Sequence, residues 1–431
     1  MYQQKKNMKV NKISLIVVFL FSCALVNVRA QETEKTFVKE NMEFAARQCK
    51  LMLNTPSQGK NGKAMMPHSM RKDGTASKGS IYLWTAGFFP GTLWYLSDYN
   101  NDKALQDSAL AYTRKMEPVK TFTDNHDIGF MMYCSYGNAN RFAPQAFYND
   151  ILVESARSLC TRYSPVTGTI KSWNSWRSWN DGTVFKYPVI IDNMMNLELL
   201  FAASRISGDD FFKKVAISHA EKTMKNQMRK DGSFYHITMY DPETGKFIKG
   251  ETSQGYSDNS AWSRGQGWAV YGFTVAYRET KDPRFLATAQ KAADYYINHP
   301  NLPSDKVAWW DFNAFQPGFT PGARSNAGKI TTNYRDASAA ALVASALFEL
   351  SGYTKGKKAQ VYLETAKQIL HSLGSPNYRA KEGENANYIL MHSTGAIPQN
   401  SEIDVPLVYA DYYFVEALHR YNKMLNNEPL F

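Results

Sequence analysis

The chain has 431 residues, is 44% hydrophobic and 21% charged, and carries a formal net charge of +11 at pH 7. Its lysines and arginines are dispersed and form no run that would follow a nucleic-acid backbone, so we expect no nucleic-acid partner. The cysteines lie far apart in the sequence, which argues against a disulfide framework and a zinc site. The mild positive excess instead favours an anionic small substrate.

Residues 1–30 have the pattern of a secretory signal peptide, with lysines before the apolar run 13–26 and small Ala30 before polar sequence. We expect cleavage near Ala30, export to the periplasm, and a mature charge of +6, because the segment holds five basic residues and no acidic one. Acylation of Cys23, as in bacterial lipoproteins, is the alternative, but apolar residues continue beyond Cys23. No later stretch is long and apolar enough to span a bilayer.

Five later segments share a large apolar residue followed four places on by Ala, within a helix-period pattern. The Ala positions are 47 to 77 residues apart, which suits a repeated pair of helices joined by loops of varying length. The five pairs are Leu105 and Ala109, Leu152 and Ala156, Phe212 and Ala216, Phe285 and Ala289, and Tyr362 and Ala366.

A second set of helical stretches alternates with these repeats, and a helix at 34–53 precedes them. The second set covers 84–98, 127–138, 191–206, 262–280, 335–352 and 405–425. About twelve helices in two alternating sets predict an all-α fold, an (α/α)6 barrel of six inner and six outer helices that forms a single domain over 31–431. We expect the second set to be inner, because unusual polar residues stand at its helix starts: Asp127, Asp192, Arg264 and Asp336.

Few strands are expected outside these helices. Residues 232–240, before the turn sequence that starts at Asp241, are the best hairpin candidate. Residues 303–334 and 374–404 are rich in Gly, Pro, Asn and Ser, and we interpret both as long loops.

The segment 251–268 has the composition of a sugar-binding wall, since it combines aromatic, charged, amide and glycine residues. If a helix begins near Ser263, Arg264 and Trp268 lie on one face and offer a fixed cation beside a flat apolar surface. A carboxylated sugar ring would use both. The ordinary alternative is an aromatic core helix with a structural arginine.

Asp127 and Asp192 each stand where a predicted inner helix begins. The usual role of such an aspartate is to cap the helix, and the helix dipole would then lower its pKa. If both carboxylates instead share one aromatic-lined cavity, desolvation and mutual repulsion would raise one pKa and allow acid catalysis. The chain has no metal-ligand spacing, no Gly-x-Ser-x-Gly elbow and no phosphate loop, so we expect neither a metal nor a cofactor.

Three stretches, 125–130, 190–197 and 254–268, resemble in sequence and order the diagnostic motifs of the unsaturated glucuronyl hydrolases, glycoside hydrolase family 88. The resemblance extends through 405–417 and so covers nearly all of the mature chain. It implies an (α/α)6 barrel. It also implies hydrolysis of the sugar that polysaccharide lyases leave at a non-reducing end, a uronate with a C4=C5 double bond.

The resemblance implies a role for each matching residue. Asp192 would protonate C4 and guide water to C5, and the hemiketal formed would open and release the reducing-side sugar. Asp127 would hold the ring hydroxyls and stay anionic. Arg264 would face the substrate carboxylate. The ring would be hydrogen-bonded by three polar residues, His126, His236 and Gln254. The pocket would be lined by four tryptophans, Trp84, Trp173, Trp262 and Trp268. Trp176 and Trp179 are close rivals of Trp173.

Two departures leave the substrate class open. Ser253 stands where some relatives place a His, and residues 392–400 lack the two Ser and one Lys of relatives that favour sulfated disaccharides. The leading hypothesis is an enzyme for lyase-generated disaccharides of chondroitin, hyaluronan or heparin type. The alternatives are an unsaturated rhamnogalacturonyl hydrolase of pectin breakdown, a non-catalytic glycan-binding toroid, and a conventional inverting glycosidase using the same carboxylates.

Overall fold

The computed structural model describes residues 31–55 and 63–431. The predicted signal peptide, residues 1–30, and the alternative acylation site Cys23 lie outside the described residues. Among the described helices, none is long and apolar enough to cross a membrane.

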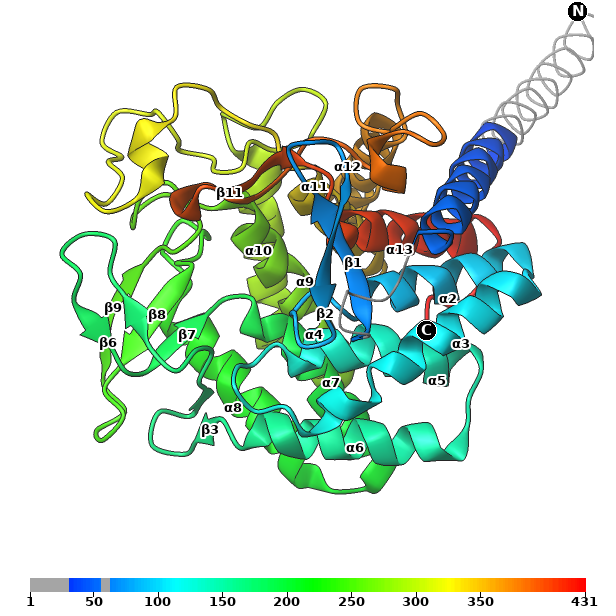
Figure 1. Ribbon diagram of the computed structural model, residues 1–431. Helices are drawn as coiled ribbons and strands as arrows, with labels where there is room; N and C mark the ends of the chain where they lie inside the picture. The colour runs from blue at the N-terminus through cyan, green and yellow to red at the C-terminus, as the bar shows by residue number, and fades with distance from the viewer. Residues whose placement is uncertain (1–30, 56–62) are drawn as a thin grey trace, which may run out of the picture.

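Six helical stretches form an inner ring in which each packs against the next, and the last packs against the first (Figure 1). All six coincide with the second set of predicted helices, so their assignment as inner helices is confirmed, as is the (α/α)6 barrel. The stretches are α2 (Phe88–Asn100), α4 (Ile128–Met132) continued by a π-helical turn (Tyr133–Gly137) and α5 (Asn138–Phe142), α7 (Asn193–Ser207), α9 (Ser263–Thr280), α11 (Ala337–Tyr353) and α13 (Val408–Leu425).

The outer helices carry the repeated pairs of a large apolar residue and Ala. All ten of these side chains are at most 2% exposed, because each pair faces the inner ring while the opposite helix face meets water. Residues 31–53 form a further helical stretch, which places Phe37 against His371 of α12. The outer helices are α3 (Lys103–Lys115), α6 (Ala146–Cys160), α8 (Asp210–Asn226), α10 (Pro283–Asn298) and α12 (Gly356–Leu373).

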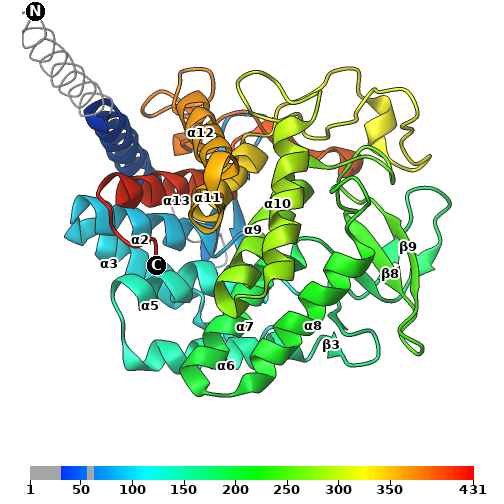
Figure 2. The same ribbon diagram turned by 180° about the vertical axis from the view of Figure 1, so that it is seen from behind.

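Short antiparallel sheets lie over the end of the ring where the inner helices begin. The predicted hairpin is a three-stranded sheet of β7 (Pro188–Ile190), β8 (Ile237–Tyr240) and β9 (Phe247–Glu251), so only part of 232–240 is strand. The expectation that 374–404 is entirely loop was wrong, because β10 (Ser393–Ala396) pairs with β11 (Ser401–Val405) there. The hairpin of β1 (Met65–Met70) and β2 (Ala76–Ser80) lies in front of the inner helices in Figure 1 and behind them in Figure 2.

The remaining elements are short connections between the helices. They comprise the strands β3 (Tyr163–Ser164), β4 (Thr169–Ile170), β5 (Trp176–Arg177) and β6 (Val184–Phe185), and the 3₁₀ turns Glu117–Thr121, Asn326–Lys329, Asn385–Asn387 and Ile397–Gln399.

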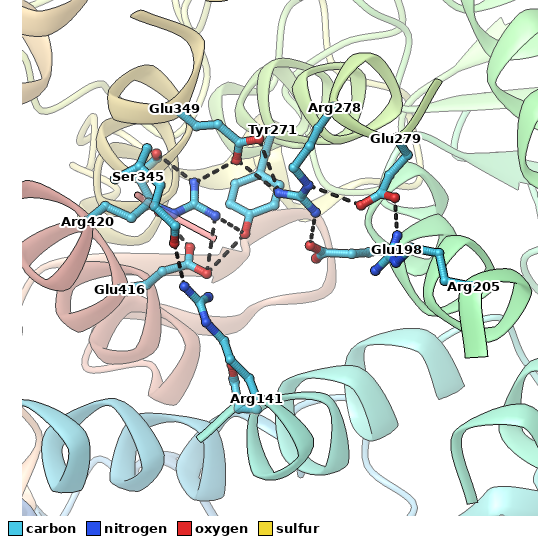
Figure 3. Close-up of polar contacts among 12 residues, drawn as sticks. Arg141, Glu198, Arg205, Tyr271, Arg278, Glu279, Ser345, Glu349, Glu416 and Arg420 are labelled. Carbon is cyan, nitrogen blue, oxygen red and sulfur yellow. Dashed lines mark hydrogen bonds and ion pairs between the residues drawn. The ribbon is translucent and has the colours of Figure 1, made fainter. Parts of the chain in front are cut away.

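A buried ionic network closes the opposite end of the ring, where the inner helices finish (Figure 3). Arg278 of α9 pairs with Glu349 of α11 at 3.1 Å and with Glu198 of α7. Arg420 of α13 reaches Glu349 at 3.2 Å and Glu416 at 3.5 Å. These ion pairs join four inner helices, α7, α9, α11 and α13.

Candidate active site

Asp127 and Asp192 occupy the N-cap positions of α4 and α7, yet neither side chain accepts a capping hydrogen bond. By contrast, the carboxylate of Asp336, at the start of α11, accepts from the N–H groups of Ser338 and Ala339. Asp127 is 9% exposed and Asp192 is 8% exposed. Capping, the ordinary explanation for both residues, is therefore excluded, and two buried carboxyl groups remain available at adjacent helix starts.

Burial raises the pKa of both carboxyl groups. The pKa of Asp127 rises to about 8, and the nearby charge of Asp192 adds to the increase. The pKa of Asp192 rises to about 7, although Arg264 opposes the increase. Because the charge of Asp192 makes Asp127 harder to ionise, the two groups ionise in succession, and near neutral pH one is an acid and the other a carboxylate.

Each aspartate faces the Nε2 atom of a buried histidine. His126 Nε2 lies 3.3 Å from Oδ1 of Asp127, and His236 Nε2 lies 3.7 Å from Oδ2 of Asp192. Burial lowers the pKa of His126 to about 3 and the pKa of His236 well below its ordinary value. Both imidazoles are therefore neutral at physiological pH and serve as hydrogen-bonding groups, not as charges.

Arg264 lies beside this pair but is already surrounded by protein acceptors. Its Nη1 donates at 2.6 Å to Asp336 Oδ2 and at 2.6 Å to the Thr394 carbonyl. Its Nη2 donates at 2.6 Å to the Gly395 carbonyl and at 3.2 Å to Gln254 Oε1. Because these four bonds use both terminal nitrogens, Arg264 acts on Asp192 through its charge, and a two-pronged contact with a substrate carboxylate requires release of Gln254.

The predicted tryptophans surround the same point. Trp262 packs between the His236 ring at 4.4 Å and the Arg264 guanidinium at 4.5 Å. Trp268 is fully buried, and its indole lowers the pKa of the Asp192 carboxyl group. Trp84 stands half-buried against Tyr409, at 4.8 Å between ring centroids.

Trp173 is the member of its cluster nearest to the predicted site, since its ring lies 6.4 Å from that of His236. The two alternatives to Trp173 form hydrogen bonds with other residues. Trp176 donates to Glu251 at 3.0 Å and Trp179 donates to the Ser253 carbonyl at 3.0 Å. The structure thus brings every residue predicted for the site into one neighbourhood.

A family model, glycosyl hydrolase family 88, matches residues 57–423. The chain belongs to this family. An unsaturated glucuronyl hydrolase from Formosa agariphila is 40% identical over 95% of this chain and 98% of its own. An unsaturated chondroitin disaccharide hydrolase from Streptococcus agalactiae is 31% identical over 79% of this chain and 81% of its own. A solved unsaturated glucuronyl hydrolase specific for heparin is 41% identical, with a TM-score of 0.81, over 92% of this chain and 99% of that chain.

These relatives make the chain an unsaturated glucuronyl hydrolase of family 88, a glycosidase of glycosaminoglycan degradation. The structure adds three residues to the neighbourhood that the sequence did not assign to it. Asp336 pairs with Arg264, Asn196 contacts His126, and the buried Tyr409 has Arg264 5.4 Å from its ring. Asp336 stood out as a helix start, but only the fold pairs it with an arginine 72 positions away.

Within residues 31–55 and 63–431, no three His, Cys, Asp or Glu side chains are grouped closely enough to hold a metal ion. The polar groups described above are instead hydrogen-bond donors, acceptors and a carboxyl pair, which suit a sugar ring and proton transfer.

Proposed function

We propose that this family 88 enzyme is exported and hydrates the C4=C5 double bond of an unsaturated uronate at the non-reducing end of lyase-generated glycosaminoglycan disaccharides. The observation that carries the proposal is the pair of buried, non-capping carboxyl groups, Asp127 and Asp192, each facing a neutral imidazole. A vinyl ether is hydrated by proton delivery to carbon and water addition, and a carboxyl group with its pKa near neutrality suits the first step.

In this mechanism Asp192 delivers its proton to C4, and the electron pair of the double bond forms the new C–H bond. Water then adds to C5 and returns a proton to the Asp192 carboxylate. The resulting hemiketal opens, the bond to the reducing-side sugar breaks, and that sugar leaves with its hydroxyl restored. Asp127, as a carboxylate, accepts hydrogen bonds from ring hydroxyls and stabilises positive character at C5.

The surroundings of Asp192 support its role as the acid, even though the free protein has the higher pKa at Asp127. Asp127 faces its imidazole at 3.3 Å, against 3.7 Å for Asp192, and substrate hydroxyls add further donors on that side. Hydrogen bonds to a carboxylate favour its charged form, so substrate binding favours Asp127 as the carboxylate and Asp192 as the acid.

We expect activity on unsaturated heparin, chondroitin or hyaluronan disaccharides, measured as loss of the ultraviolet absorbance of the conjugated C4=C5 group. We expect the highest activity on heparin-type disaccharides, because the solved relative with 41% identity is specific for heparin. Activity only on unsaturated rhamnogalacturonan fragments would replace this assignment with pectin breakdown. Binding without turnover on either class would favour a glycan-binding toroid, and turnover of saturated substrates a conventional inverting glycosidase.

Export rests on the signal-like sequence of residues 1–30. Expression of the full chain in a Gram-negative host should give periplasmic protein whose N-terminal residue, determined by mass spectrometry, lies near Gln31. A diacylated N-terminal Cys23 would show a lipoprotein instead. Retention of Met1 in the cytoplasm would contradict export.

A further inference from the structure

Asn196 joins the two helix starts that carry the carboxyl groups. It lies in α7, four residues after Asp192, and is fully buried. Its Oδ1 accepts from the Phe130 N–H of α4 at 2.8 Å, and its Nδ2 lies 3.2 Å from Nδ1 of His126. The helices touch at this point, since a Cβ added to Gly129 would lie 2.4 Å from Asn196 Oδ1.

These contacts determine which nitrogen of His126 carries the proton. A backbone N–H can only donate, so Asn196 must turn its oxygen towards Phe130. The amide nitrogen, which can only donate, then faces His126, whose Nδ1 must be the unprotonated acceptor. The neutral ring therefore carries its proton on Nε2, the atom that lies 3.3 Å from Asp127.

His236 has the same arrangement without a side chain in the role of Asn196. Its Nδ1 accepts from the backbone N–H groups of Ser253 and Gln254, both at 3.0 Å. Its Nε2–H therefore faces Asp192 at 3.7 Å. Each carboxyl group of the pair thus has a nearby imidazole N–H, without hydrogen-bond geometry, whose tautomer is set by donors on the far side of the ring.

We propose that Asn196 is a positioning residue that holds His126 in the Nε2–H tautomer, so that an N–H group and not a lone pair stands 3.3 Å from the Asp127 carboxyl group. This inference rests on the proposed roles of Asp127 and Asp192. An N–H group beside Asp127 favours the charged form of that carboxyl group, whereas a lone pair would disfavour it. Asn196 would therefore act on Asp127 through the His126 ring, without contacting the substrate itself.

The test is Asn196→Asp, examined by ¹⁵N NMR of histidine-labelled protein. The aspartate keeps an acceptor for Phe130 but offers His126 no N–H, so Nδ1 must take up a proton. Wild-type His126 is expected to show a protonated Nε2 and a bare Nδ1, and the variant a protonated Nδ1. A bare Nδ1 retained in Asn196→Asp, or a protonated Nδ1 in the wild type, would overturn the inference.

The variant should lower kcat by about 100-fold with little change in KM. This is less than the ~10⁴-fold that a wrong tautomer costs a histidine that itself transfers the proton. The pH–rate profile should also shift, because the groups that face Asp127 and His126, namely Asp192, Arg162 and His219, then meet a relocated ring proton and an added carboxyl group. Unchanged kcat with a changed tautomer would contradict the proposed role.

Asn138→Asp is the matched control. Asn138 is also a buried helical amide, and it donates to the Cys134 carbonyl at 2.9 Å and the Tyr412 hydroxyl at 3.0 Å without touching His126. Asn138→Asp should show the loss of stability that comes from burying a carboxylate, but it should leave the His126 signal and the pH–rate profile unchanged. If Asn196→Asp fails to fold, Asn196→Ala removes the same donor and should give a mixture of His126 tautomers.

The tautomer is measured without substrate, so two failures are distinguishable. A wild-type protein that is inactive on every unsaturated disaccharide would end the proposed function, while a Nε2–H ring at His126 would still support the positioning by Asn196.

Discussion

Asp192→Asn is expected to lower kcat on the unsaturated disaccharide by about 10²–10⁴-fold, the contribution typical of a positioned general acid. An amide keeps the shape of the carboxyl group but has no proton to deliver to C4. Substrate binding should persist, because the neighbouring residues His236, Trp262 and Arg264 are unchanged. Single-turnover kinetics and equilibrium binding separate the two effects, and a variant with normal kcat would exclude Asp192 as the acid.

The same variant should be more stable than the wild type at alkaline pH. The folded pKa of Asp192, about 7, lies above the ordinary value of 3.8, so ionisation is harder in the folded protein than in the unfolded chain. The resulting loss in the free energy of unfolding is absent below pH 4, grows between pH 4 and pH 7, and is constant above pH 7. Removing it should raise the free energy of unfolding at pH 8 by on the order of 2–4 kcal/mol.

Urea unfolding at pH 4 and pH 8 measures this difference. Asp282→Asn is the control, because Asp282 caps α10 and pairs with Arg284, which lowers its pKa. That variant should lose a little stability at pH 8 and keep full activity. Equal stability of Asp192→Asn and the wild type at both pH values would show that Asp192 is not held in its raised-pKa state.

The wild-type activity itself should fall as the pH rises through about 7 to 8, since the carboxyl pair then loses its remaining proton. Such an alkaline limb belongs to the pair and not to either aspartate alone.

The ring of helices could be predicted because its signals are local. A large apolar residue and Ala four places later mark the buried stripe of an outer helix, as at Phe285 and Ala289, which are both fully buried. The inner helices are buried on nearly all sides, so their assignment as inner depended on the polar residues at their starts. Asp127 and Asp192 were found in this way.

The strands β10 and β11 could not be predicted because their backbone is irregular. Glu402 and Asp404, within β11, have φ values of 55° and 54°, and the register of the pair shifts between Ser393 and Thr394. Such strands lack the alternation of apolar and polar residues that reveals a strand in a sequence. Their carbonyl groups at Thr394 and Gly395 nevertheless hold Arg264, so part of the site was missed with them.

The sequence also could not show which of the aspartates at helix starts cap their helices. Asp127, Asp192 and Asp336 all stand at helix starts, and only side-chain orientation distinguishes the one that caps from the two that do not. Orientation depends on neighbours from distant segments. For Asp336 the neighbour that orients the side chain is Arg264, which is a buried charge. We therefore expect substitution of Asp336 to have the largest effect on stability.

Asp336→Ala is expected to reduce the free energy of unfolding by about 3–5 kcal/mol, the cost of leaving a buried charge without its partner. Arg264 is 1% exposed and cannot turn to water, and Asp336 is fully buried beside it. The change also removes the acceptor that caps α11 at Ser338, at 3.1 Å. The uncompensated positive charge should in addition lower the pKa of Asp192 and weaken it as an acid.

Asp336→Asn separates these contributions, because its carbonyl oxygen can still cap α11 while the charge is lost. It should be less destabilising than Asp336→Ala by about 1 kcal/mol, the usual contribution of an N-cap. Combining Asp336→Ala with Arg264→Met removes both charges, and the double variant should recover part of the stability, since the buried charge is gone. Additive losses in the double variant would instead mean that the two residues stabilise the barrel independently, and that the ion pair does not fix Arg264 beside Asp192.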